Sequence, residues 1–327
     1  MSNKTSKLAF AVAVCCFTCA AQQTVDVAIQ KGQIDVSIGG KPFTTYYMSD
    51  AVAKPYLMPL RSAQGTIVTR GYPVGNEVPP GAEHDRSFEP HQRPLYFAHG
   101  NIDGLDFWGE EAFAKYFHDH GQQAYGRMAL EKMDEARGGA SGVIKAEFKL
   151  LAPSGRVIGE ETQAFTFRGD DRTRIIDCEF TVHATHGPLT FGDSKEGTFG
   201  IRVTKELDSP PGRMVNSLGT EGEKAIWGKP ADWVDYYGKV ADEDVGIAVL
   251  DHPKSFRHPT TWHARGYGLF AANPFGLRDF THDPNQDGSW TIPEHKSLTF
   301  RYRVIIHHGD YREANIADAY QKYAAEP

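Results

Sequence analysis

Alternation of apolar and polar residues recurs along most of this sequence and restricts the fold more than any other feature. Alternating segments or short apolar runs, bounded by Gly, Pro, Asn and Asp, occupy residues 33–48, 142–167, 173–184, 198–203, 245–252 and 297–309. A period of two places successive side chains on opposite faces of a strand, and the bounding residues are typical of turns. We therefore predict a mainly β protein, folded as an antiparallel β-sandwich.

Two segments have helical spacing instead. Residues 109–120 predict a short helix. Residues 312–325 predict a terminal helix that places Ile316, Ala319, Tyr320 and Tyr323 on one face. We expect this helix to pack on a sheet.

The first 21 residues have the pattern of a secretory signal peptide. Lys4 and Lys7 precede an apolar run, and small residues end it at Ala20 and Ala21. Lipidation at Cys19 is the second interpretation, because Phe17 and Thr18 precede that cysteine unfavourably. We expect a periplasmic or secreted protein.

The remaining residues, 22–327, contain neither a linker nor a repeat, so a single β-sandwich domain is expected. Removing Lys4 and Lys7 from the 35 basic residues leaves 33 against 42 acidic residues, a net charge of −9. This charge argues against a nucleic-acid partner. No later segment approaches the roughly 18 apolar residues of a membrane span. Cys178, the one cysteine left, is expected to be a buried apolar residue.

Polar and aromatic residues gather in four segments, at residues 84–110, 191–203, 216–238 and 250–276. Aromatic rings beside hydrogen-bonding groups are how proteins hold sugars, so we predict a carbohydrate ligand or substrate. The predicted substrate-binding residues are Asp106, Trp108, Lys195, Glu196, Asn216, Trp227, Trp233, Asp235, Trp262, Asn273 and His307. The alternative is that the tryptophans fill the core.

Histidine, carboxylate and arginine side chains near these rings could transfer protons and stabilise developing charge. The predicted catalytic residues are His91, Arg93, His99, His258 and His263. A strand over residues 93–99 would place Arg93 and His99 on one face, so we expect them to line a concave site with His91, Trp262 and His263. Asp103 and Asp106 are the expected charge partners. The alternative is a structural Arg–Asp pair that holds the turn.

No spacing selects the two facing carboxylates of a glycosidase, and no phosphate loop, nucleophile elbow or dinucleotide motif occurs. We predict an exported carbohydrate-active enzyme of hydrolase, lyase or epimerase type that uses histidine and carboxylate acid–base chemistry. Proton abstraction at a sugar carbon is favoured over glycoside hydrolysis. The alternative is a noncatalytic glycan-binding protein with an aromatic-lined face.

The histidine spacings match no zinc motif, and we predict no metal and no cofactor. Residues 283–294 match the calcium-loop template, with Asp283, Asn285, Asp287, Gly288 and Glu294 at its positions. Helices do not flank this segment in the predicted pattern. We therefore favour a hairpin that turns at Asp287–Gly288.

Long stretches, including "RPLYFAHGNIDGLDFW", "FGDSKEGTFGIR" and "WGKPADWVDYYG", resemble the PmoA-like family of bacterial exported proteins. The resemblance implies a sandwich similar to the galactose mutarotase-like supersandwich, in polysaccharide-degrading bacteria. The label "methane oxygenase" that the family often carries fits poorly, because that reaction belongs to membranes. Glu89 and Gln92 stand where family members commonly have histidines.

Overall fold

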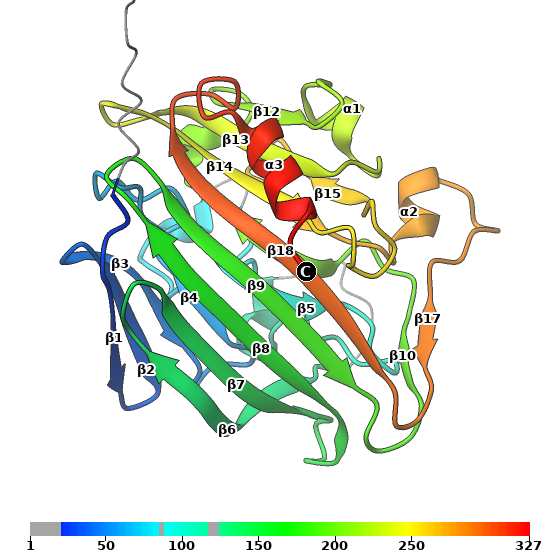
Figure 1. Ribbon diagram of the computed structural model, residues 1–327. Helices are drawn as coiled ribbons and strands as arrows, with labels where there is room; N and C mark the ends of the chain where they lie inside the picture. The colour runs from blue at the N-terminus through cyan, green and yellow to red at the C-terminus, as the bar shows by residue number, and fades with distance from the viewer. Residues whose placement is uncertain (1–20, 85–87, 117–123) are drawn as a thin grey trace, which may run out of the picture.

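Two eight-stranded antiparallel sheets face each other in the computed structural model, which describes residues 21–84, 88–116 and 124–327 (Figure 1). The predicted signal peptide, apart from Ala21, lies outside these residues. The first sheet has the order β1 (Val25–Gln30), β2 (Gln33–Ile38), β3 (Lys41–Tyr47), β4 (Tyr56–Met58), β5 (Leu95–His99), β11 (Gly197–Arg202), β16 (Leu269–Ala272) and β15 (Trp262–Ala264). The second has the order β12 (Arg213–Asn216), β13 (Trp233–Val240), β14 (Glu243–Asp251), β18 (Ser297–His308), β9 (Arg174–His183), β8 (Val157–Gly169), β7 (Gly142–Leu151) and β6 (Arg127–Arg137).

Aromatic rings from the two sheets meet in the core between them. Phe97 of β5 stacks on Phe180 of β9 with 4.4 Å between ring centroids. Phe199 of β11 stacks on Tyr302 of β18 at 4.7 Å. Ring pairs of this kind stabilise a fold by about 0.5–1.5 kcal/mol each beyond their buried area. These contacts confirm the predicted antiparallel sandwich, and Cys178 lies buried in the same core, as expected.

Short helices decorate the sandwich, as predicted. The terminal helix α3 (Ile316–Ala324) buries Ile316, Tyr320 and Tyr323 against the outer face of the second sheet (Figure 1). The segment predicted as a helix at 109–120 contains the 3-10 helix η2 (Glu111–Tyr116), and its last residues lie outside the described part. The remaining helical turns are η1 (Ala82–His84), η3 (Lys205–Leu207), α1 (Glu223–Ile226) and α2 (Leu277–Thr281).

The hairpin predicted at Asp287–Gly288 is wrong. These residues follow α2, and the next strand, β17 (Trp290–Ile292), pairs with the distant β10 (Leu189–Phe191). The backbone N–H of Gly288 instead donates to Asp193 Oδ2 at 2.6 Å. The turn therefore fastens this loop to the segment before β11.

One carboxyl group lies inside the sandwich. Glu161 of β8 is 1% exposed and accepts a 2.7 Å hydrogen bond at Oε1 from Gln163 Nε2. Gln163 Oε1 in turn accepts a bond from the buried hydroxyl of Tyr46, on β3 of the facing sheet. Burial raises the pKa of Glu161 to about 8, so this side chain is neutral at pH 7.

Candidate functional site

The outer face of the first sheet, turned away from the sandwich core, carries the candidate site. On β11, Phe199 and Ile201 point into the core, so Thr198, Gly200 and Arg202 point to the opposite face. Antiparallel pairing places Tyr96 of β5 opposite Gly200. Ala271 of β16 lies opposite Gly200 on the other side and opposite His263 of β15. The register thus brings three distant segments onto one surface.

Glu196 and His263 form the titratable centre of this surface. His263 is 1% exposed, and neither of its ring nitrogens meets the geometry of a hydrogen bond to a described residue, although the backbone of Lys195 lies close enough to act on its pKa. Burial lowers the pKa of His263, while the Glu196 carboxylate acts to raise it. Lys195 Nζ lies 3.4 Å from Glu196 Oε1, and the lysine side chain is the more exposed of the two. A neutral buried imidazole beside a carboxylate can take up or release a proton from a bound molecule.

Aromatic side chains surround this pair. The buried hydroxyl of Tyr96 and the indole N–H of Trp108 lack hydrogen-bond partners in the described part of the chain. Their rings are 4.6 Å apart, and a Cβ at Gly200 would lie 2.8 Å from Trp108 and 3.0 Å from Tyr96. Glycine is therefore required there for the two rings to cover β11. Trp227, half-buried, lies edge-on to His263 at 6.4 Å. We call Glu196, His263, Tyr96, Trp227 and Tyr267 the Glu196 site.

Tyr267 connects the Glu196 site to a second polar group. Its hydroxyl lies 3.5 Å from Gln92 Nε2, and the guanidinium of Arg202 stacks 4.6 Å from its ring centroid. Arg202 Nη1 donates to Gln92 Oε1 at 2.7 Å. His91, next along the chain, is 1% exposed, and its Nδ1 lies 3.4 Å from Glu89 Oε2. His91 thus lies beside this group, although no contact joins it to His263.

Asn273 positions the segment that carries Glu196. Its buried Nδ2 donates to the backbone carbonyls of Ser194 and Lys195, each at 2.9 Å. The predicted binding residue Asn273 is therefore a positioning residue.

His99 lies in the core, contrary to the expectation that it lines a concave surface. Its ring packs between Phe191 and Phe275, because its parity on β5 is that of Phe97. Nε2 donates to the Gly192 carbonyl at 2.7 Å, and burial lowers the pKa of His99 to about 4. It anchors the start of the segment that leads to Glu196.

Arg93 is held in a buried ion network. Its Nε and Nη2 donate to Glu110 Oε1 and Oε2 at 2.8 and 2.6 Å, and Lys54 Nζ lies 3.1 Å from Oε1. All three side chains are at most 1% exposed. Burial acts to raise the pKa of Glu110, but the two cations outweigh it and lower that pKa. The alternative of a structural ion pair therefore describes Arg93, but the carboxylate in that pair belongs to Glu110 and not to an aspartate.

The expected partners Asp103 and Asp106 bind backbone N–H groups instead, Asp103 across to β10 and Asp106 within its own turn. Asp103 Oδ1 accepts a bond from the Thr190 backbone N–H, and Asp106 Oδ1 from that of Gly109, both at 2.8 Å. Placing them at Arg93 was wrong.

His258 and His307 belong to the second sheet, not to the Glu196 site. His258 Nδ1 lies 2.8 Å from Asp251 Oδ2, a hydrogen bond that raises the pKa of His258. His307 Nε2 lies 3.2 Å from Asp235 Oδ2, with both groups buried. In both cases the histidine pairs with a carboxylate of the second sheet, so these two predicted site residues do not lie with His263.

Trp262, Trp233 and Asn216 were also predicted to bind substrate, and each has a structural role instead. Trp262 points into the core and donates its indole N–H to the Ala231 carbonyl at 2.9 Å, opposite in direction to its neighbour His263. Trp233 packs under α3. Asn216 caps its own turn through bonds from Leu218 N and Thr220 N, both 3.1 Å. The core-filling alternative holds for the two tryptophans, and Asn216 stabilises a turn.

The sequence interpretation missed Tyr96 and Tyr267 of the Glu196 site, and Gln92 and Arg202 beside it. Tyr96 and Arg202 could have been found from the alternation of side chains along a strand, because they point to the face opposite to that of the core residues Phe97 and Phe199. Gln92 and Tyr267 lie in loops, where no periodicity marks a face.

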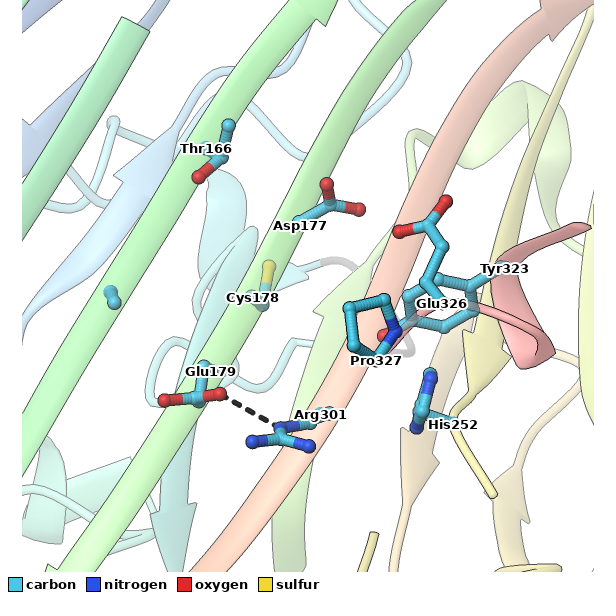
Figure 2. A pocket seen from close by; sticks show the side chains of 10 residues that line it. Thr166, Asp177, Cys178, Glu179, His252, Arg301, Tyr323, Glu326 and Pro327 are labelled. Atoms are coloured by element: carbon cyan, nitrogen blue, oxygen red, sulfur yellow. Dashed lines mark hydrogen bonds and ion pairs between the residues drawn. The ribbon is translucent and has the colours of Figure 1, made fainter. Parts of the chain in front are cut away.

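A separate cavity of about 280 Å³ lies on the second sheet beside the chain end (Figure 2). Figure 2 shows Glu179 paired with Arg301, whose Nε donates at 2.8 Å, while Glu326 and Pro327 close one side. Its charged groups already neutralise one another, so the Glu196 site is the stronger candidate.

Among residues 21–84, 88–116 and 124–327, no group of three or more His, Cys, Asp or Glu side chains is arranged to hold a metal ion. No helix within those ranges is long and apolar enough to cross a membrane.

Residues 33–321 match the model of a family described as "Family of unknown function (DUF6807)". No curated protein matches the chain in sequence. Similar solved structures include a galactose mutarotase-like protein from Clostridium acetobutylicum, with 10% identity and a TM-score of 0.42 over 88% of this chain and 99% of that one. A putative aldose 1-epimerase from Escherichia coli K12 has 10% identity and a TM-score of 0.36 over 88% and 100%. An α-galactosidase from Lactobacillus brevis has 6% identity and a TM-score of 0.42 over 93% of this chain but only 42% of its own. Likenesses at these values assign no activity.

Proposed function

This chain belongs to the DUF6807 family of unknown function, and we propose that it is an exported carbohydrate-active enzyme whose Glu196 and His263 carry out acid–base chemistry on a saccharide. The observation that carries the proposal is His263, a buried imidazole whose pKa the Glu196 carboxylate acts to raise and whose ring nitrogens make no well-formed hydrogen bond to a described residue. A buried polar group without a partner costs about 1–3 kcal/mol. A substrate hydroxyl at His263 would remove that cost.

The expected chemistry is proton transfer. His263 is neutral near pH 7 because burial lowers its pKa, so it can accept a proton from a sugar hydroxyl or carbon. Glu196 is the second group that can exchange a proton. The Tyr96 hydroxyl can donate a hydrogen bond to an oxygen that gains negative charge. The ring of Trp227 stacks on His282 at 5.3 Å, and the part of this half-buried ring that stays exposed could contact the sugar.

A reaction of epimerase or lyase type fits this arrangement better than glycoside hydrolysis. Hydrolysis commonly needs two facing carboxyl groups. A further carboxylate near this surface, Glu223, is 2.9 Å from Arg265 Nε and accepts a bond from the Gly266 backbone N–H at 2.6 Å. Glu223 is therefore occupied by its own loop.

The test is an assay of purified protein against a broad oligosaccharide set, with product analysis by mass spectrometry and NMR. Glu196→Gln and His263→Gln should each lower kcat by about 100-fold or more. His307→Gln is the matched control, because His307 is equally buried but lies on the second sheet. Full activity in both site variants would refute the proposal.

A noncatalytic glycan-binding protein is the second candidate, favoured by the half-buried rings of Trp227 and Tyr267. In that case saccharides would bind without chemical change. Trp227→Ala would then weaken binding, and both the wild type and Glu196→Gln would return the saccharide chemically unchanged.

Export is proposed from the signal-peptide pattern of residues 1–21. Membership of the PmoA-like family stays a prediction. N-terminal sequencing of protein recovered from the periplasm should begin near Gln22.

A further inference from the structure

A cleft of about 520 Å³ lies where loops of both sheets meet. Its walls are the segment after β3, the start of η2, the residues that lead into β6 and the turn between β7 and β8. All of its lining residues belong to the described part of the chain. The volume falls within the range of about 300–1,000 Å³ that small-molecule sites have. We call it the Tyr125 cleft, after the aromatic residue that lines it together with Asp50, Asn76, Glu111 and Arg127.

One wall of the Tyr125 cleft is fixed by side chains that hold its backbone. Arg127 Nη2 donates to the Asp50 carbonyl at 3.0 Å. Asn76 Nδ2 donates to the Ala51 carbonyl at 3.1 Å. These bonds attach the segment after β3 to two other lining segments. The cleft is therefore formed before a ligand arrives, which lowers the entropy cost of binding.

Tyr125 supplies an aromatic ring to the cleft. The ring is half-buried, and a Cβ at Gly109 would lie 2.8 Å from its Cε1, so one part of the ring lies directly against that glycine. Burial and then the carboxylates of Asp106 and Glu111 raise the pKa of Tyr125, so its hydroxyl keeps its proton at neutral pH and can donate a hydrogen bond. A ring surface beside a hydroxyl donor suits a sugar, which has both apolar C–H faces and polar oxygens.

The charged groups of the lining restrict the class of ligand. They are the carboxylates of Asp50 and Glu111 and the guanidinium of Arg127, which lies 3.9 Å from Asp50 Oδ1. Two carboxylates against one guanidinium oppose a phosphate, sulfate or carboxylate ligand, because like charges repel. A sugar hydroxyl can donate to a carboxylate and accept from a guanidinium. The lining therefore matches a neutral ligand that is rich in hydroxyl groups.

We propose that the Tyr125 cleft is a second binding site, which takes a neutral saccharide with a sugar ring against Tyr125 and its hydroxyl groups at Asp50, Glu111 and Arg127. Residues 106–109 connect this cleft to the surface of the Glu196 site, because Trp108 packs on Tyr96 and the next residue, Gly109, lies against Tyr125. A saccharide chain bound in the cleft would stay close to that surface. The inference goes beyond the proposed function, since binding in the cleft needs no acid–base chemistry.

The test is calorimetry of the Glu196→Gln protein, in which turnover is blocked, with neutral oligosaccharides of glucose, galactose, mannose or xylose units. Adding Tyr125→Ala should weaken binding of the preferred saccharide by about tenfold or more, whereas Tyr125→Phe should keep most of the affinity because the ring remains. Tyr311→Ala is the matched control, since Tyr311 is also half-buried but packs against Trp233 on the second sheet. Unchanged affinity with Tyr125→Ala would overturn the inference.

A second variant decides the matter if Tyr125→Ala does not fold. Ala51 is an exposed residue of the lining, so Ala51→Trp fills the cleft without removing a packed side chain and should abolish the same binding.

The class of ligand is tested with glucuronate-containing, sulfated and glucosamine oligosaccharides, which should all bind more weakly than the neutral one. Tighter binding of any of these charged saccharides would overturn the inference. Turnover that depends on Glu196, with binding unchanged by Tyr125→Ala and Ala51→Trp, would refute the inference and leave the proposed function standing. Binding that both variants remove, in a protein that turns over no saccharide, would support the inference and refute the proposed function.

Discussion

Replacing Glu161 by glutamine should stabilise this protein at neutral pH. The carboxyl group is buried between the sheets, with a pKa raised from 4.5 to about 8. In the unfolded chain it ionises above pH 4.5, whereas in the folded chain it stays protonated. The unfolded state therefore binds fewer protons between these values, and stability falls as pH rises through that window.

The magnitude follows from the shift. Each pH unit above 4.5 costs about 1.4 kcal/mol, which gives about 3 kcal/mol at pH 7. Glutamine has nearly the same shape and cannot ionise. Its Oε1 can still accept the bond from Gln163 Nε2. Glu161→Gln should thus gain about 3 kcal/mol at pH 7 and almost nothing at pH 4.5.

Urea unfolding of both proteins at several pH values between 4.5 and 8 measures this difference. Comparing wild type and variant at each pH cancels the contributions of the other titrating groups, including His307 and His258, to the free energy of unfolding. Glu160→Gln is the control, because Glu160 is the preceding residue on β8 and points to the solvent side. A difference that does not change with pH, or a variant less stable throughout, would refute the reasoning.

Three further changes test other contacts. His99→Ala should lower the free energy of unfolding by about 3 kcal/mol through a core cavity and a lost hydrogen bond; a drop in kcat without loss of stability would contradict this. Asn273→Ala should lower kcat about 10- to 100-fold in steady-state kinetics, because the segment carrying Glu196 loses two anchoring bonds; unchanged kcat would exclude a positioning role. Removing Glu326 and Pro327 should cost about 1 kcal/mol, since Glu326 pairs with Arg303 at 2.8 Å near the surface; an unchanged urea midpoint would show that this pair contributes nothing.

Strands with one buried and one wet face were predictable where the sequence alternates clearly, although the edge strands β1 and β6 were not predicted. β2 alternates buried and half-buried residues along its whole length, and its sequence alternates accordingly. β13 escaped prediction because Trp233 to Tyr237 are all buried, one face by the core and the other by α3 and its neighbours. Burial on both faces removes the alternation that reveals a strand.

The site was only partly predictable, because the face on which a side chain lies depends on register. Trp262 and His263 are adjacent and equally buried, yet Trp262 points into the core and His263 points to the outer face of the first sheet, where the Glu196 site lies. A shift of one residue would exchange them. Sequence gathers such residues into one segment but does not choose between them.

The buried network of Arg93, Glu110 and Lys54 has a consequence for how this family can diverge. One carboxylate satisfies two cations where water does not reach. Losing Glu110 first would strand two positive charges, and losing Arg93 first would leave Glu110 with the lysine alone; breaking a buried pair costs about 3–5 kcal/mol. Replacement of all three by apolar residues could be neutral, but each single step toward it is unfavourable. Relatives should therefore keep the trio or lack it entirely, and chimaeras that mix the two types across Lys54 and Glu110 should fail to fold.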